Sequence, residues 1–112
     1  MDYDRYDVVI VPFPFTDKAQ VKRRPALVVS GSAAFNKKVG HSVMAMITSA
    51  NNPPWPLDVP VSDLAAAGLP APSVVRMKLF TLDQRFILAK RGMLSDKDRK
   101  AVGRALKMAL EL

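Results

Sequence analysis

The chain has 112 residues, of which 49% are hydrophobic and 24% charged, as is typical of one globular domain with a single core. It contains no cysteine, which excludes disulfides, iron–sulfur clusters, thiolate zinc sites and a thiol nucleophile. The net charge of +7 comes from 17 basic and 10 acidic residues in both halves of the chain, and it favours polyanionic partners, nucleic acid first.

The sequence gives no sign of a membrane or secretory segment. No apolar run is long enough to cross a bilayer, and the acidic, polar start of the chain is unlike a signal peptide. We therefore expect a single domain over residues 1–112 that is cytoplasmic and has no membrane partner.

Two β-branched segments near the N-terminus predict the first strands. Residues 7–13 form a continuous apolar run bounded by prolines, which indicates a strand buried on both faces. Residues 25–30 predict the second strand, opened by Pro25 where a missing N–H is tolerated. We expect Pro12 and Pro14 to end the hydrogen-bonded ladder of the first strand.

The segment between these strands, residues 14–23, predicts a loop that carries Lys18, Lys22 and Arg23. Arg24 follows where the loop meets the strand, so its backbone should be fixed and its side chain free. A rigid guanidinium beside a basic loop is suited to holding a phosphate. On spacing alone, Arg24 is equally well a surface arginine that precedes a proline.

The rest of the chain predicts short strands followed by one clear helix. In chain order, we expect a polar connection (31–38), a strand (41–48), a short strand (57–61), a helical turn capped by Ser62 (62–68), an extended segment (69–72), a strand (73–77), a turn (81–83) and a strand (86–93). Short strands closed by a terminal helix predict a mainly β fold of the α+β class, built as a small, strongly bent sheet or barrel.

The terminal helix is predicted by its start and by its apolar face. Ser95 is an N-cap candidate, and Asp96 and Asp98 fall in the first turn, where the helix dipole favours negative charge. The apolar face consists of Val102, Leu106, Ala109 and Leu110. This face serves either the core of the subunit or a dimer interface.

Few residues can carry acid–base or metal chemistry. His41 is the one histidine, so a two-histidine pair within a subunit is impossible. The acidic residues are scattered without metal-ligand spacing and no glycine-rich phosphate loop is present, so we expect neither a metal nor a cofactor. Ser30 and Ser42, near His41, carry no motif that supports a Ser–His–Asp arrangement.

RNA cleavage remains open to such a chain, because the 2′-hydroxyl of the substrate is itself the nucleophile. Arg24 would stabilise the charge that develops on the phosphorus oxygens, and Thr48 would donate a hydrogen bond to the same phosphate. Arginine is a poor general base because its pKa lies above ~12, so the proton acceptor is not assigned. Thr48 also fits the end of a strand that simply favours β-branched residues.

A series of segments resembles the MazF/PemK toxin family, in the right order and over nearly the whole chain. The segments are DVVIVPFPFTD (7–17), RRPALVVS (23–30), AMITS (45–49), GLP (68–70), SVVR (73–76), TLD (81–83) and the helix start at Leu94-Ser95. The resemblance implies an SH3-like barrel of the MazF and CcdB type that forms a homodimer.

The same resemblance implies a ribosome-independent endoribonuclease toxin that cleaves single-stranded mRNA at short sequences and is inhibited by a cognate antitoxin. DNA binding would belong to the toxin–antitoxin complex. The catalytic arginine of the family precedes the proline of the second strand, which is Arg24 here, and its catalytic threonine ends the third strand, which is Thr48 here. This chain departs from the pattern at Tyr6, where many members have glycine, and at Ala19, where some have a glutamate.

We expect several further residues to bind the RNA. They are Lys18, Lys22, Arg23, Trp55, Arg76 and Lys78. Trp55 either fills the core or offers a platform on which a base stacks. Arg76 and Lys78 either line an RNA groove or face solvent.

Two alternatives stay open at this stage. A gyrase-poisoning toxin on the same fold would bind its target without catalysing a reaction, and it would not need Arg24 and Thr48 together. A catalytically inactive relative would bind RNA or a partner peptide.

Overall fold

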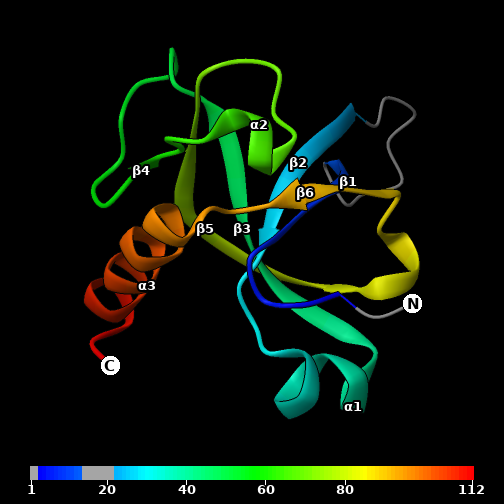
Figure 1. Ribbon diagram of the computed structural model, residues 1–112. Coiled ribbons are helices and arrows are strands. Elements are labelled where there is room, and N and C mark those ends of the chain that lie inside the picture. Colours follow the sequence, from blue (N-terminus) through cyan, green and yellow to red (C-terminus); the bar gives the residue numbers. More distant parts are fainter. Residues whose placement is uncertain (1–2, 14–21) are drawn as a thin grey trace.

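A curled, fully antiparallel sheet of six strands forms the body of the protein (Figure 1). The computed structural model describes residues 3–13 and 22–112. The strands are β1 (Asp7–Phe13), β2 (Lys22–Val28), β3 (His41–Ser49), β4 (Val59–Pro60), β5 (Ser73–Asp83) and β6 (Ala89–Met93), in the spatial order β4-β5-β3-β2-β1-β6. The helices are α1 (Lys37–Val39), α2 (Leu64–Ala67) and α3 (Asp96–Leu110), with a π-helical turn at Ser32–Asn36 and a 3-10 turn at Gln84–Phe86. The predicted mainly β fold with a C-terminal helix is confirmed.

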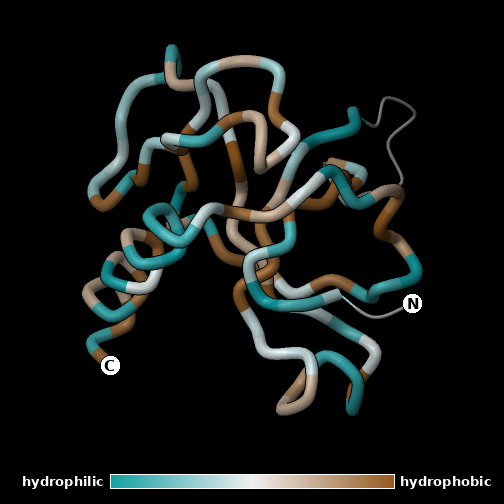
Figure 2. The backbone as a smooth tube through the Cα atoms, viewed as in Figure 1, coloured by the Kyte–Doolittle hydropathy of each residue, from teal (hydrophilic) through white to brown (hydrophobic). Residues whose placement is uncertain are grey.

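The two faces of the sheet carry separate cores, because successive side chains of a strand point to opposite faces. On one face, α3 packs on the sheet, and this core includes Val8, Leu27, Ala45, Ile47, Val75, Val102 and Leu106. On the other face, the core includes Val9, Val11, Ala26, Val28 and Met44. Figure 2 shows hydrophobic segments concentrated in the strands, whereas α3 is mostly hydrophilic with apolar residues interspersed. No helix among the described residues is long and apolar enough to span a membrane.

The apolar face of α3 serves the core of the subunit. Val102 and Leu106 are buried, at 0% and 6% exposure, as is Ala105. Ala109 and Leu110 of the predicted face are exposed, because α3 extends past the sheet at its C-terminal end, so for these two residues the dimer-interface alternative stays a prediction.

The first turn of α3 is tied to the segment that leads into α2. The side chain of Ser95 accepts a hydrogen bond from the Asp98 N–H at 3.3 Å, which confirms the predicted cap. The Asp98 carboxylate is buried and accepts bonds from the Ser62 hydroxyl at 2.7 Å and from the N–H groups of Ser62 and Asp63. Burial alone would raise the pKa of Asp98, but these hydrogen bonds outweigh it and hold the pKa below its ordinary value.

The second strand begins earlier than predicted, at Lys22 rather than at Pro25. Cross-strand pairing with β1 extends the strand, because Lys22, Arg23 and Arg24 stand opposite Phe13, Pro12 and Val11. These three basic residues are therefore strand residues, not part of a loop or of its junction. The strand also ends two residues early, at Val28.

Pro12 does not end the β1 ladder, contrary to the prediction. The Leu88 N–H donates to the Ile10 carbonyl, so Ile10 points its backbone groups toward β6. Pro12 lies two residues further along β1 and faces the same side. The last β1–β6 pair joins Ile10 to Ala89, so β6 has no residue opposite Pro12 and no N–H is needed there. Pro14 lies outside the described residues.

Five other predictions differ from the structure in the type or extent of an element or in its cap. The connection 31–38 contains helical turns, held in part by the buried Asn36 side chain, which donates to the Tyr3 carbonyl at 2.9 Å. The turn predicted at 81–83 is strand, because β5 pairs with β3 up to Asp83 and this pairing overrides the local turn preference. A 3-10 turn at Gln84–Phe86 follows β5, so the last strand starts at Ala89 instead of residue 86. The fourth strand, β4, has only two residues. Asp63, not Ser62, caps α2 by accepting from the Ala66 N–H at 3.0 Å.

Candidate functional site

Strand register brings Arg24 and Thr48 together although they are 24 positions apart in sequence. Ala26 pairs with Met46 across β2 and β3, and continuing this register by two residues places Arg24 opposite Thr48. Both side chains leave the same face of the sheet, beyond the end of the second core. The sheet therefore supplies a fixed backbone for each, as the sequence predicted for Arg24.

Arg24 and Thr48 line two adjoining cavities, which we call the Arg24–Thr48 groove. The larger cavity, of about 500 Å³, is lined by Ile10, Arg24, Pro25, Ile47, Thr48, Ser49, Gly68, Leu69, Pro70, Ala71, Ser73 and Arg91. The smaller, of about 200 Å³, is lined by Phe13, Arg24, Met46, Ile47, Thr48, Asn52, Trp55, Arg76 and Lys78. Of the predicted site residues, the structure thus brings together Arg24, Thr48, Trp55, Arg76 and Lys78.

The Thr48 hydroxyl is held by a neighbour that leaves its proton available. The Asn52 side-chain N–H donates to Thr48 Oγ1 at 2.5 Å. Because a hydroxyl can accept and donate at the same time, Thr48 still has its O–H to donate into the groove. Asn52 was not predicted from the sequence, where it stood in a proline-rich loop without any motif.

Arg76 is oriented by a carboxylate and stacks on the exposed indole of Trp55. Its guanidinium donates to Asp58 from Nε at 3.2 Å and from Nη2 at 3.0 Å, and also to the Pro53 carbonyl at 2.9 Å. The same guanidinium lies 4.9 Å from the centre of the Trp55 ring. The hydrogen bond from Arg76 holds the pKa of Asp58 below its usual value. Trp55 is 45% exposed, so it does not fill the core.

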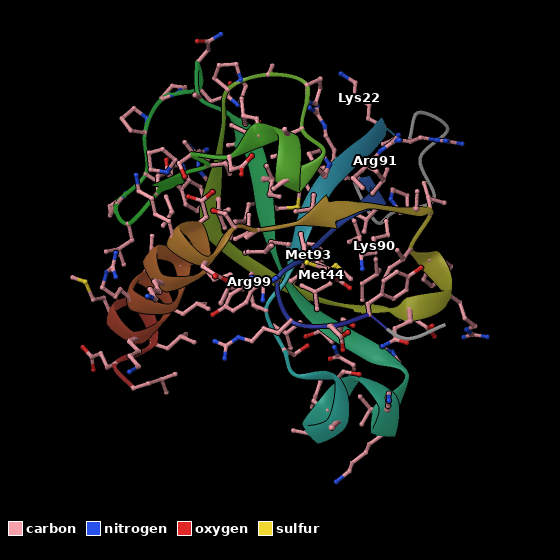
Figure 3. All side chains as sticks on the ribbon, viewed as in Figure 1. Lys22, Met44, Lys90, Arg91, Met93 and Arg99 are labelled. Carbon is pink, nitrogen blue, oxygen red and sulfur yellow. The ribbon has the colours of Figure 1, made fainter. Side chains whose placement is uncertain are left out.

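The other predicted cations fall into three situations. Lys78 lies on the groove with its ammonium 5.3 Å from the centre of the Phe13 ring. Lys22 and Arg23 are exposed on β2 but line neither cavity, and Figure 3 shows Lys22 at the outer end of that strand. Lys18 lies outside the described residues.

Arg91 lines the larger cavity, and sequence reasoning missed it. It sits on β6, whose backbone packs directly on the end of α2: a Cβ on Gly68 would lie 2.3 Å from the Arg91 carbonyl oxygen. Gly68 also has φ +68°, a left-handed conformation that favours glycine. The Gly68-Leu69-Pro70 segment was the available sequence signal for a close backbone approach, but the signal does not identify the partner strand.

The groove is cationic, and its chemistry is that of hydrogen-bond donation. Arg24 lines both cavities together with Thr48, Arg91 lines the larger, and Arg76 and Lys78 line the smaller. Within the described part of the chain, no carboxylate or histidine lines either cavity. His41 begins β3, whereas Thr48 lies seven residues further along it, roughly 23 Å away at the usual rise of a strand. Such a site can bind a phosphodiester and stabilise negative charge that builds on it.

Comparisons with known proteins give one family and a consistent fold. A family model described as "PemK-like, MazF-like toxin of type II toxin-antitoxin system" matches residues 4–110. A comparison with curated proteins finds no match.

Several solved structures share the fold over nearly their whole length. MazF from Deinococcus radiodurans has a TM-score of 0.77 at 23% identity, covering 100% of this chain and 99% of that one. Toxin MazF-mt6 from Mycobacterium tuberculosis has a TM-score of 0.75 at 23% identity, covering 95% and 97%. An endoribonuclease solved in complex with its cognate antitoxin, from a mycobacterial species, has a TM-score of 0.76 at 19% identity, covering 99% and 95%.

Proposed function

Since the chain belongs to the PemK-like, MazF-like toxin family of type II toxin–antitoxin systems, we propose that it is a metal-independent, sequence-selective endoribonuclease that cleaves single-stranded mRNA in the cytoplasm. The observation that carries the proposal is the meeting of Arg24 and Thr48 in one groove with three further predicted RNA-binding residues. Endoribonucleases are named among the structures that share the fold.

The proposed reaction uses the RNA's own nucleophile. The 2′-oxygen forms a bond to the adjacent phosphorus, and the bond from that phosphorus to the 5′-oxygen breaks. The proton that leaves the 2′-hydroxyl is matched by the proton that the 5′-oxygen gains, so the products are a 2′,3′-cyclic phosphate and a 5′-hydroxyl. Arg24 donates to the non-bridging oxygens, and the free O–H of Thr48 donates to the same phosphate.

The donor-rich groove favours charge stabilisation as the main catalytic effect. None of its described lining residues is a carboxylate or a histidine, so the chemistry relies on donors already aimed at the phosphate rather than on a strong general base. Groups that are fixed before the reaction lose little energy in reorganising during it. Thr48, bonded to Asn52, meets that requirement, and the paired strand fixes the backbone that carries Arg24.

Trp55 and Arg76 are suited to hold a base next to the scissile phosphate. Stacking on an exposed aromatic ring contributes about 1–3 kcal/mol per base in single-stranded complexes. Arg76 is fixed by Asp58 and so keeps the indole in place from one side. Selectivity for short sequences would arise at this end of the groove.

We also propose a homodimer and neutralisation by an acidic antitoxin segment. Exposed apolar side chains of Leu88 and Met93 lie at the β6 edge of the sheet, where another chain can pair or pack. MazF from Deinococcus radiodurans has been solved as a MazE–MazF complex. An acidic segment that covers the cationic groove would compete with RNA, and linkage makes that competition reciprocal.

The proposal is tested by adding the purified protein to a long mRNA in EDTA and resolving the products. We expect discrete fragments with cyclic-phosphate ends, and no cleavage at a site whose scissile nucleotide is 2′-O-methylated. Cleavage of that modified site, or activity that returns only with a divalent ion, would overturn the mechanism. Intact RNA together with inhibition of DNA gyrase in a supercoiling assay would favour the gyrase-poisoning alternative. RNA binding without any cleavage would indicate an inactive relative.

A further inference from the structure

A second cationic cleft lies on α3, apart from the Arg24–Thr48 groove. It is open, has a volume of about 610 Å³, and shares no lining residue with the groove. Its lining residues are Arg5, Tyr6, Arg99, Lys100, Gly103, Arg104, Lys107 and Leu112. Five of the chain's 17 basic residues therefore line one cleft that contains no acidic side chain.

Two of the five cleft cations, Arg99 and Arg5, contact neutral groups, which leave their charge uncancelled. Arg99 donates to the Leu94 carbonyl at 2.8 Å and to the Met93 sulfur at 3.1 Å, near which Figure 3 places it. Its guanidinium and that of Arg5 lie over the Tyr6 ring, 5.8 and 4.9 Å from the ring centre.

Two arginines outside the cleft are held by carboxylates. Arg76 pairs with Asp58 at 3.0 Å and Arg85 with Asp83 at 2.8 Å. Among residues 3–13 and 22–112, no ion pair joins a cleft cation to a carboxylate. The two cleft arginines thus have neutral partners, where Arg76 and Arg85 have carboxylates.

Tyr6, which forms one wall of the cleft, is held in a backbone conformation that disfavours it. Its φ is +75°, in the left-handed region, where a non-glycine residue costs about 1–2 kcal/mol. The conformation persists because the Tyr6 N–H donates to the Val28 carbonyl at 2.6 Å and its carbonyl accepts from Leu94 at 3.1 Å. Opposite the ring, a Cβ on Gly103 would lie 3.4 Å from the Tyr6 hydroxyl. Strained residues of this kind are concentrated at ligand sites.

We propose that this cleft binds the phosphodiester backbone of the RNA that flanks the cleaved site. The inference rests on the proposed function, whose substrate supplies the ligand. Arg99 and Lys107 are eight residues apart on α3, which spans about 12 Å, and one stacked strand carries about three to four phosphates over that length. Arginine forks and lysines on an open surface suit phosphates, because they bind charge without reading bases.

The proposal is tested with variants that remove two charges from the cleft or from elsewhere. The cleft variant is Arg104→Gln with Lys107→Gln, and the matched control is Lys38→Gln with Lys97→Gln. All four side chains are exposed, and Lys38 and Lys97 line neither the cleft nor the groove. The probes are single-stranded RNAs of about 30 and about 6 nucleotides, because the longer one exceeds the 33 Å extent of the protein several-fold at roughly 3.4 Å per nucleotide.

We expect the cleft variant alone to bind the long RNA more weakly. Losing two phosphate contacts should lower the slope of log affinity against log salt by about 1.4, which is about 25-fold in affinity at 0.1 M salt. Single-turnover cleavage of the short RNA should be unchanged, because the groove is intact. Circular dichroism and sedimentation should show the same fold and the same mass for both variants and the wild type.

Three outcomes would overturn the proposal. Equal losses in the cleft and control variants would mean that net charge, not the cleft, attracts RNA. A change of mass in the cleft variant alone would make the cleft a contact between subunits. Unchanged binding of the long RNA by the cleft variant would mean that the cleft makes no contact with the RNA backbone. If the wild type cuts no RNA, the proposed function fails, and the binding comparison still decides the role of the cleft.

Discussion

Two neighbouring arginines on β2 allow a direct test of where the reaction takes place. Arg23 and Arg24 carry the same charge and are both exposed, but as consecutive strand residues they point to opposite faces of the sheet. Arg24 lines both cavities of the groove, and Arg23 lines neither. Replacing each by alanine therefore separates general attraction of RNA from direct contact with the reacting phosphate.

The magnitudes expected for the two variants differ in kind. Each loses at most one phosphate contact, which lowers affinity for single-stranded RNA by about fivefold at 0.1 M salt. Arg24→Ala also loses one donor to the transition state, an effect of roughly 3–4 kcal/mol or several hundredfold in the cleavage rate. Arg23→Ala should cleave at nearly the wild-type rate once RNA is saturating.

The assay is single-turnover cleavage at saturating RNA, with affinity measured separately. Arg24→Lys should not restore the rate, because an ammonium lacks the bidentate fork of the guanidinium. Thr48→Val keeps the shape but loses the hydroxyl, so its rate should fall in the same way as that of Arg24→Ala, though less. Equal rate losses for Arg23→Ala and Arg24→Ala would refute the placement of the active site.

Two further predictions concern the supports of the site. Asp98→Asn should lower the free energy of unfolding by about 2–3 kcal/mol at neutral pH, because it removes the charge that three hydrogen-bond donors stabilise, the N–H and hydroxyl of Ser62 and the N–H of Asp63. Since the pKa of Asp98 is lowered in the folded state, the stability that its charge contributes is present above the unfolded pKa near 3.9 and is lost as pH falls below it. The free energy of unfolding measured in urea should therefore fall more between pH 7 and pH 3 in the wild type than in the variant. An equal fall in both proteins would contradict this. Gly68→Ala should destabilise the protein by about 2 kcal/mol or more and reduce cleavage, because the new methyl group meets the Arg91 carbonyl and φ stays positive; an unchanged melting temperature would exclude this packing.

Most of the fold could be predicted because its local signals agree with its tertiary structure. The β-branched run of β1 and the capped, amphipathic α3 both have periodicities that tertiary packing preserves. The errors arose where pairing across strands overrides local preference. By local sequence, Arg23 and Arg24 resemble loop residues next to a proline, but pairing with β1 makes them strand residues. In the same way, residues 81–83 resemble a turn, but pairing with β3 makes them part of β5.

The site was predicted in its key residues but not in their supports. The resemblance identified Arg24 and Thr48, and the structure brings both to the groove, whereas their catalytic role stays a prediction. Asn52 was missed although it lies four residues from Thr48, because its proline-rich loop carries no motif, and Arg91 was missed because β6 is remote in sequence from β2 and β3, which carry Arg24 and Thr48 to the groove. Register and backbone packing place them there, and neither leaves a recognisable spacing.

The left-handed backbone of Tyr6 makes the effect of a substitution at this position depend on which residues stand at positions 5 and 99. Glycine adopts that backbone conformation freely, so tyrosine at position 6 starts with a disadvantage of about 1–2 kcal/mol. Contacts of its ring with Arg5 and Arg99 offset part of that disadvantage, each only while its own cation is present. The three positions should therefore be epistatic: the Tyr6 ring also packs against the core, so Tyr6→Gly should lower the melting temperature, but less in a protein that lacks both arginines than in one that keeps them. Additive effects in that double-mutant cycle would mean that the ring and the cations are independent.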